Sequence, residues 1–153
     1  MTSITIDVLI AHDVHDTWDE LRHIERHVTW MSDAQRIDFH SDQREGVGTT
    51  FDCRTKIGPF TTTDAMTITH WETESTMGVT HHGLFVGSGE FNLVAVGNST
   101  RLSWTESIRF PWWMGARLGE WIARPLLRHI WRTNLESLAQ IIALNSGGDS
   151  PTT

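Results

Sequence analysis

Four ionisable side chains interrupt rows of apolar residues in segments that otherwise alternate like β-strands: Asp64, His70, His81 and Glu106. Every second residue of a strand lies on the same face, so the alternation predicts that these four point inward with their apolar neighbours. A buried ionisable group is costly unless it is hydrogen-bonded, paired, or used by a ligand or a reaction. The pattern therefore predicts a cavity lined by a few polar groups.

Glu106 is the main candidate for chemistry, with His81 as its partner and Asp64 as a third group. It shares its predicted face with Trp104 and Ile108. Burial among such residues disfavours the ionised form of a carboxyl group, which suits a general acid or base for an enolisation, an aldol cyclisation or a dehydration. In the alternative interpretation, Glu106 pairs with an arginine or a backbone donor, Asp64 caps a turn, and the histidines lie at strand ends, partly in water. The residues alone leave both interpretations open.

Nine histidines are many for 153 residues, but they form no metal-binding motif. His23 and His27 are spaced to share one face of a helix, yet no third ligand accompanies them, and neither HExxH nor CxxC occurs. Cys53 is the single cysteine, which excludes an internal disulfide and favours a buried apolar thiol over a nucleophile. We therefore expect neither a metal nor another cofactor.

The composition indicates one soluble globular domain. The chain has 153 residues, 39% of them hydrophobic and 20% charged, with a net charge of -7, and this length suffices for one core. No apolar run is long enough to cross a membrane, and no signal peptide is evident. We expect a cytoplasmic domain over residues 1–144, followed by a flexible tail over residues 145–153 that is rich in Gly, Ser, Pro and Thr.

The hydrophobic period changes along the chain in an order that predicts the elements of the fold. Alternation from Ile4 to Ala11 predicts a first strand, Asp13 follows as a helix N-cap, and two short helices come next. Further strands are predicted at residues 37–39, 51–57, 60–70, 77–81, 84–96 and 102–110. The register of segment 84–96 is ambiguous, and Gly87 and Gly89 suggest a bend or bulge there.

An apolar stripe from Leu127 to Ile142 predicts a long amphipathic C-terminal helix. Pro125 is expected in its first turn, because a proline deeper inside would remove a hydrogen bond. Residues 112–124 would then form a separate helix or a kinked lead-in.

The order of strand, two short helices, antiparallel strands and terminal helix resembles the helix-grip fold of the START/Bet v1-like (SRPBCC) superfamily. The segments ITIDVLIAHDVHDTWDEL, REGVGTTFDCRT, GNSTRLSWTESIRF and NLESLAQIIA resemble most closely the bacterial group of polyketide cyclase/dehydrase and lipid-transport proteins. The resemblance implies an α+β fold in which a curved antiparallel sheet of about six or seven strands encloses an apolar cavity beside the last helix. It leaves catalysis open, because one fold hosts several functions.

The resemblance implies a hydrophobic or amphipathic small-molecule ligand, such as a lipid, a polyketide or an isoprenoid-like compound. A cavity of roughly 300 to 1,000 Å³ is expected near Trp104. The alternative is a polyketide cyclase, aromatase or dehydratase that uses Glu106 and His81 as acid and base. The expected ligand contacts are Phe51, Cys53, Met66, Ile68, His70, Val79, Trp104, Ile108, Trp112, Trp113 and Trp131.

Trp112, Trp113 and Met114 are consecutive bulky residues in a connection, so they cannot all face one core. They form a lid, a wedge that touches a membrane or a protein partner, or a layer packed under the last helix. Residues 109–132 carry five arginines against Glu120, a formal charge of +4 that leaves -11 on the rest of a chain whose total is -7. This asymmetry argues against nucleic-acid binding by the whole domain.

The arginine row along this segment is either a solvated face or a contact for anions. Arg124 and Arg128 are the residues expected to hold the anionic end of a ligand, a lipid headgroup or an acyl-carrier partner. A third hypothesis makes the chain an interaction module that uses Trp112, Trp113 and the arginine face. The sequence indicates no particular oligomeric state.

Overall fold

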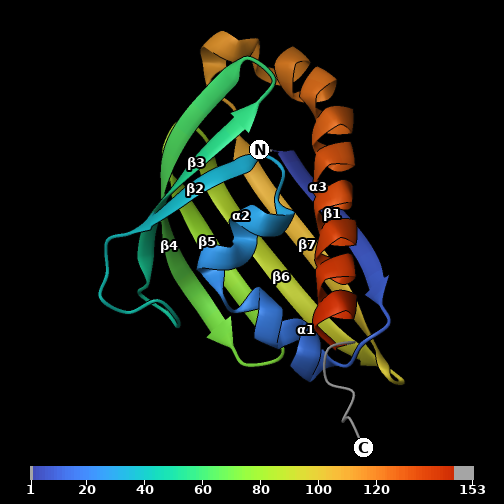
Figure 1. Ribbon diagram of the computed structural model, residues 1–153. Helices are drawn as coiled ribbons and strands as arrows, with labels where there is room; N and C mark the ends of the chain where they lie inside the picture. Colours follow the sequence, from blue (N-terminus) through green and yellow to red (C-terminus); the bar gives the residue numbers. More distant parts are fainter. Residues whose placement is uncertain (1, 147–153) are drawn as a thin grey trace, which may run out of the picture.

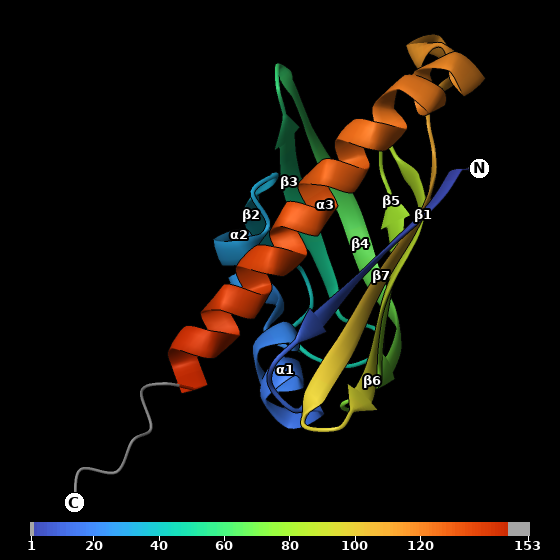
Figure 2. The ribbon, with the colours of Figure 1, turned by 90° about the vertical axis from the view of Figure 1, so that its right-hand side faces the viewer.

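A seven-stranded antiparallel sheet curves around a long C-terminal helix in the computed structural model, which describes residues 2–146 (Figure 1, Figure 2). Two short helices and one 3-10 turn follow the first strand and cover the lower part of the concave face. The elements are β1 (Thr2–Ile10), α1 (Val14–Leu21), η1 (Ile24–Arg26), α2 (His27–Trp30), β2 (Ala34–Phe39), β3 (Thr50–Ile57), β4 (Phe60–Glu72), β5 (Thr76–His82), β6 (Val86–Val96), β7 (Ser99–Arg109), η2 (Trp112–Met114) and α3 (Ala116–Ser146).

The strand order is β1-β7-β6-β5-β4-β3-β2, and all neighbours are antiparallel. Strands β2 to β7 form a continuous meander, whereas β1 pairs with β7, so that Thr5 lies opposite Thr105. This arrangement confirms the α+β helix-grip fold expected from the sequence.

Local sequence explains the first elements. Ile4, Ile6 and Ile10 alternate along β1 and are all buried. Asp13 is the N-cap of α1, because its carboxylate accepts the backbone N–H of Asp16 at 2.9 Å. The predicted strand and cap are therefore confirmed.

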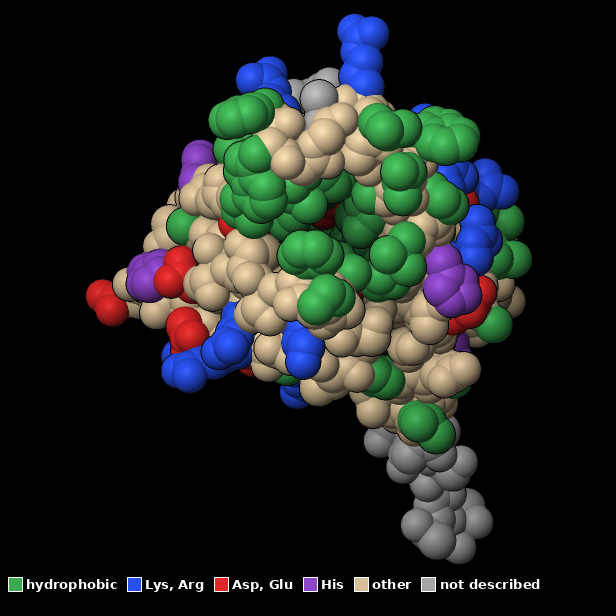
Figure 3. Space-filling model, turned by 90° about the horizontal axis from the view of Figure 1, so that it is seen from above, with side chains coloured by type: hydrophobic (Ala, Val, Ile, Leu, Met, Phe, Trp, Pro, Cys, Tyr) green, Lys and Arg blue, Asp and Glu red, His purple; other side chains and the backbone are tan. Residues whose placement is uncertain are grey.

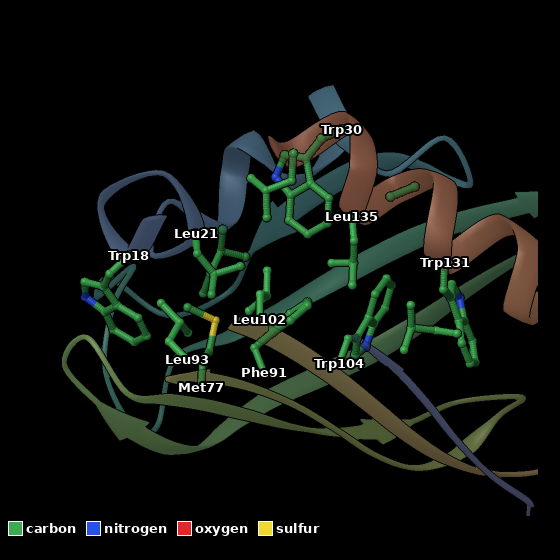
Figure 4. Close-up of a cluster of buried hydrophobic side chains, with 14 of the residues drawn as sticks. Trp18, Leu21, Trp30, Met77, Phe91, Leu93, Leu102, Trp104, Trp131 and Leu135 are labelled. Atoms are coloured by element: carbon green, nitrogen blue, oxygen red, sulfur yellow. The ribbon is translucent and has the colours of Figure 1, made fainter. Parts of the chain in front are cut away.

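The core lies between the sheet, the short helices and the C-terminal half of α3 (Figure 4). Leu135 projects from α3 toward the sheet, and Leu102 belongs to the same buried cluster. Both are fully buried, and each such side chain stabilises the fold by about 1.5 to 3 kcal/mol through burial. Farther up the helix, the rings of Trp131 and Trp104 lie 5.4 Å apart, and beyond them the interior opens into a chamber.

Two irregularities differ from the expectations. The register between β6 and β7 runs without interruption from Val86 to Val96, so the bulge expected near Gly87 and Gly89 is not found in this strand. A register shift occurs instead in β4, between Ile68 and His70.

Helix α3 begins at Ala116 and continues through Pro125 to Ser146. The prediction that Pro125 stands in the first turn is therefore wrong. The proline leaves the Trp121 carbonyl without its helical partner, and this is tolerated because Trp121 and Pro125 are both exposed to water. The helix extends two residues into the expected tail, and residues 147–153 lie outside the described part of the chain. Among residues 2–146, no helix is long and apolar enough to span a membrane.

Candidate functional site

A chamber of about 140 Å³ lies between the concave face of the sheet, residues 24–34 and α3. It is smaller than the 300 to 1,000 Å³ expected from the sequence. A more open groove of about 350 Å³ adjoins it between the β3–β4 turn and α3, and Asp33 and Ile57 line both spaces. Seen from above, this end of the molecule is hollowed and ringed by hydrophobic side chains (Figure 3).

Glu106 lies on the inner face of β7 and is 5% exposed. Its Oε1 accepts the indole N–H of Trp104 at 2.9 Å. Its Oε2 lies 3.2 Å from Nε2 of His81, but the two groups are not aligned for a hydrogen bond, and neither atom has another hydrogen-bond partner among residues 2–146. An ion-pair contact with free hydrogen-bonding capacity therefore faces the chamber.

Two glycines make room for the carboxylates of the chamber. Gly89 of β6 lies opposite Glu106, and a Cβ at that position would overlap the carboxylate and lie 2.7 Å from its Cδ. A Cβ at Gly83 would overlap the carboxylate of Asp64. Gly89, one of the two glycines that suggested a bulge in β6, thus leaves space for the Glu106 carboxylate next to the β6 backbone.

His81 faces Glu106 from β5 and is largely buried. Burial lowers the pKa of the imidazole, but the nearby carboxylates of Glu106 and Asp64 raise it more, so its pKa lies above the usual value. The contact therefore favours protonated His81 beside Glu106.

Asp64 lines the chamber but is already engaged. Its Oδ1 accepts the backbone N–H of Leu84 at 2.7 Å and the Thr62 hydroxyl at 3.4 Å. Asp64 thus organises the turn between β5 and β6, as the alternative interpretation expected, while remaining close enough to His81 to raise its pKa.

The sequence did not single out Asp33, which precedes β2 and lines the chamber and the groove. Burial raises the pKa of Asp33, although the hydrogen bond from Asn134 Nδ2, at 2.7 Å, lowers it. The Asn134 Oδ1 accepts the backbone N–H of Ser32 at 2.9 Å. The sequence offered one indication of this site, because Asn134 is the one polar residue in the predicted apolar stripe of the terminal helix.

His27 is a second lining residue that the sequence did not assign to the cavity. It packs against Trp30 and Phe91, and its Nε2 lies 2.7 Å from the Leu21 carbonyl oxygen. Burial lowers its pKa to about 4. His27 is therefore neutral at pH 7, and its ring donates to Leu21. It shares no helical face with His23, which precedes η1.

Most of the predicted ligand contacts line the chamber, together with the predicted Glu106, His81 and Asp64. They are Phe51, Cys53, Met66, Ile68, Val79, Trp104, Ile108 and Trp131. Burial raises the pKa of Cys53 to about 11, so its thiol is a wall of the chamber rather than a nucleophile.

The prediction that His70 faces the interior is wrong. The register shift after Ile68 reverses the alternation of β4. His70 is consequently half exposed on the outer face, where its Nδ1 lies 3.5 Å from Glu90 Oε2.

The residues expected at a portal lie outside the chamber. Trp112 and Trp113 are 84% and 58% exposed and line neither the chamber nor the groove. Arg124 and Arg128 are also exposed, and a guanidinium N–H of Arg124 donates to the Ser3 carbonyl at 3.3 Å. Within the described part of the chain, no lysine or arginine lines the chamber.

The polar groups of the chamber are therefore mostly acceptors. Asp33, Asp64 and Glu106 supply carboxyl oxygens, whereas of the two lining histidines His27 donates to Leu21 and His81 faces Glu106. Within residues 2–146, no group of three or more His, Cys, Asp or Glu side chains could hold a metal ion. The chamber thus suits a molecule that donates hydrogen bonds and disfavours an anion.

No protein-family model matches this chain, and no curated protein matches it in sequence. Solved structures do match it. A protein from Thermus thermophilus superposes with a TM-score of 0.81 at 13% identity, over 95% of this chain and 99% of that one. The Zhui aromatase/cyclase from Streptomyces sp. R1128 gives 0.76 at 11% identity, over 93% of each chain.

A plant protein shows the same architecture. Major latex-like protein 151 from Panax ginseng gives a TM-score of 0.69 at 11% identity, over 91% of this chain and 95% of that one. The similarity extends through the sheet and the terminal helix at low identity, so it concerns architecture. The chain shares the helix-grip fold of these solved structures.

Proposed function

We propose that the protein binds a small, largely apolar molecule that carries a hydroxyl or N–H donor. The observation that carries this proposal is the Glu106 Oε2 atom, which is buried in an apolar chamber, lies 3.2 Å from His81 Nε2 in an ion-pair contact, and has no aligned hydrogen-bond donor among residues 2–146. Leaving such an acceptor unsatisfied costs about 1 to 3 kcal/mol. A ligand hydroxyl pointed at Glu106 would recover that free energy.

The dimensions limit the part of the ligand that enters. A void of about 150 Å³ holds a molecule the size of benzene, and the chamber has about 140 Å³. A compact ring would occupy the chamber, and a longer substituent would extend past Asp33 and Ile57 into the groove. A lipid, polyketide or isoprenoid-like molecule of this shape meets both requirements.

Calorimetric titration with p-cresol, p-xylene and p-toluate tests the proposal, because the three probes share a ring and differ in one polar group. We expect p-cresol to bind most tightly and p-toluate least. Glu106→Leu should remove the preference for p-cresol over p-xylene, whereas Glu90→Leu, on the outer face, should leave it unchanged. Equal affinity of the wild-type protein for p-cresol and p-xylene would overturn the role given to Glu106.

A second candidate function is acid–base catalysis of the kind that a cyclase, aromatase or dehydratase requires. The observation favouring it is the 3.2 Å contact between Glu106 and His81, together with the raised pKa of His81. The Glu106 carboxylate would accept a proton from the carbon beside a ketone, while protonated His81 donates one to the ketone oxygen. The C–H bond breaks, an enol O–H bond forms, and the ion pair becomes a neutral pair.

Hydrogen–deuterium exchange of 2-tetralone, followed by NMR in D₂O, tests this candidate. We expect the wild-type protein to accelerate exchange at the carbon between the carbonyl and the ring. His81→Gln should slow exchange while p-cresol still binds. Equal exchange with and without protein would leave binding as the function and remove catalysis.

A further inference from the structure

Exposed hydrophobic side chains gather at the end of the molecule where the chamber opens (Figure 3). They come from the β3–β4 turn, the β5–β6 turn with the start of β6, η2, and the first turns of α3. Each is 40% exposed or more. We call this set the apolar rim: Phe60, Leu84, Val86, Trp112, Trp113, Leu118, Trp121, Ile122 and Leu126.

Helix α3 contributes to the apolar rim through a face that does not pack on the core. Leu118, Trp121 and Ile122 recur at helical spacing on the side opposite Leu127, which is buried against the domain. Farther along the helix, the same outward side carries Arg132, Glu136 and Gln140, which are exposed polar residues. The outer side of α3 is therefore apolar over its first turns, where it borders the mouth of the chamber, and polar at positions 132, 136 and 140.

The turn η2, which carries the two consecutive tryptophans of the rim, packs against α3. Gly115 ends η2 with a φ of 89°, a conformation that favours glycine. A Cβ at Gly119 would overlap the Met114 carbonyl oxygen, so the absence of a side chain lets η2 pack directly on α3. Trp112 and Trp113 are thus exposed on a turn with a defined backbone.

The charges around the rim are positive in an otherwise acidic protein. Arg109, Arg117, Arg124 and Arg128 are exposed, and Glu120 is the single acidic residue between positions 107 and 132. The Glu120 carboxylate already accepts the Thr2 hydroxyl. The partner that covers the rim should therefore combine negative charge with an apolar interior.

We propose that the apolar rim docks the protein peripherally on membranes that contain anionic lipids, with the mouth of the chamber toward the bilayer. Tryptophan prefers the zone between lipid headgroups and acyl chains, and arginines beside that zone attract anionic headgroups. Phe60 and Leu126 belong to both the rim and the groove. An apolar ligand could therefore pass from the bilayer to the groove without crossing water.

Vesicle flotation measures this docking with phosphatidylcholine alone and with about 30% phosphatidylglycerol added. We expect the wild-type protein to float with the mixed vesicles and to lose most of this binding in about 0.5 M salt. Trp112→Ser combined with Trp113→Ser should weaken binding by about tenfold or more. Arg117→Gln and Arg128→Gln should each weaken it by about fivefold.

Leu144→Ser is the matched control, because Leu144 is 77% exposed on the same helix but at its far end. This variant should float like the wild-type protein. Absence of wild-type flotation, or equal loss in the Leu144 variant, would overturn the proposal. A dimer in sedimentation analysis that the paired tryptophan variant dissolves, without flotation of the wild-type protein, would instead assign the rim to a second copy of the chain.

The binding of p-cresol by the paired tryptophan variant separates this inference from the proposed function. We expect that variant to keep the wild-type affinity for p-cresol, since neither tryptophan lines the chamber. Loss of flotation with retained p-cresol binding supports docking through the rim. A simultaneous loss of both would overturn the assignment of the two tryptophans to the membrane contact alone.

Discussion

At Glu106, the two oxygens of one carboxylate have different surroundings. Oε1 is held by the indole N–H of Trp104, whereas Oε2 faces His81 and the chamber. The tryptophan therefore orients the acid, and the orientation leaves one oxygen available. A single carboxylate on β7 therefore raises the pKa of a neighbour and also borders the chamber in which the proposed ligand would lie.

Glu106→Gln should lower the pKa of His81. The change removes the negative charge that raises this pKa while it keeps an oxygen for Trp104. NMR titration of the His81 ring protons measures the effect. Glu90→Gln is the control, because Glu90 lies beside His70 on the outer face, and it should leave the pKa of His81 unchanged. An unchanged pKa in the Glu106 variant would show that the two side chains do not interact.

Gly89→Ala should destabilise the protein by about 1 to 3 kcal/mol, because the added Cβ overlaps the Glu106 carboxylate. Urea unfolding of the single variants and of Gly89→Ala with Glu106→Ala completes a double-mutant cycle. The cost of the alanine at position 89 should shrink in the double variant, since the overlapping side chain is gone. Additive costs would mean that the backbone at position 89 requires glycine, and that space for the Glu106 carboxylate is not the reason.

Strict alternation predicted the inward positions of Asp64, His81 and Glu106, because their strands keep a regular register around these residues. It failed at His70 because a one-residue shift in β4 reverses the faces beyond it. Asp33 and His27 could not be placed in the same way. They lie outside the sheet, and tertiary packing of residues 24–34 brings them to the chamber.

At the scale of elements, α3 carries an unusual combination of a long continuous helix and an internal proline. The sequence predicted the amphipathic stripe from Leu127 onward but placed Pro125 in the first turn of this helix, whereas the helix begins at Ala116. The expectation rested on the cost of an interior proline, which is about 3 kcal/mol. That cost is acceptable here because the remainder of the helix is anchored by Trp131, Leu135 and Leu138 in the core.

Pro125→Ala should raise the free energy of unfolding by about 1 to 3 kcal/mol, because it restores a backbone donor in an exposed helix interior. Chemical denaturation measures the gain. Amide exchange of the segment around residue 125 should slow at the same time. Arg128→Ala, at a neighbouring exposed position, should change stability much less. No gain from the alanine would contradict the cost assigned to the interior proline.

At the scale of the whole molecule, His27 links stability to pH. Its pKa falls from 6.5 to about 4 on folding, so the unfolded chain takes up the proton more readily between those values. Its contribution is present in full above about pH 6.5 and is lost as the pH falls toward 4, by about 3 kcal/mol. Urea unfolding at pH 7 and pH 4.5 measures the loss.

His27→Gln should reduce this acid sensitivity, because glutamine does not titrate yet offers an N–H to the Leu21 carbonyl. His129→Gln is the control, since His129 is exposed on α3, and it should follow the wild-type dependence on pH. If His27→Gln and the wild-type protein lose stability equally between the two pH values, buried carboxylates account for the acid sensitivity instead.

The pairing of β1 with β7 has a consequence for biosynthesis. Strands β3 to β7 can each join the preceding strand as the chain leaves the ribosome, but β1 must wait about 100 residues for its neighbour. Its isoleucine row stays uncovered during that time, as does the concave face that α3 will cover, and such surfaces attract chaperones or aggregate. The nascent chain thus exposes the concave face of its sheet to the cell until α3 has been made.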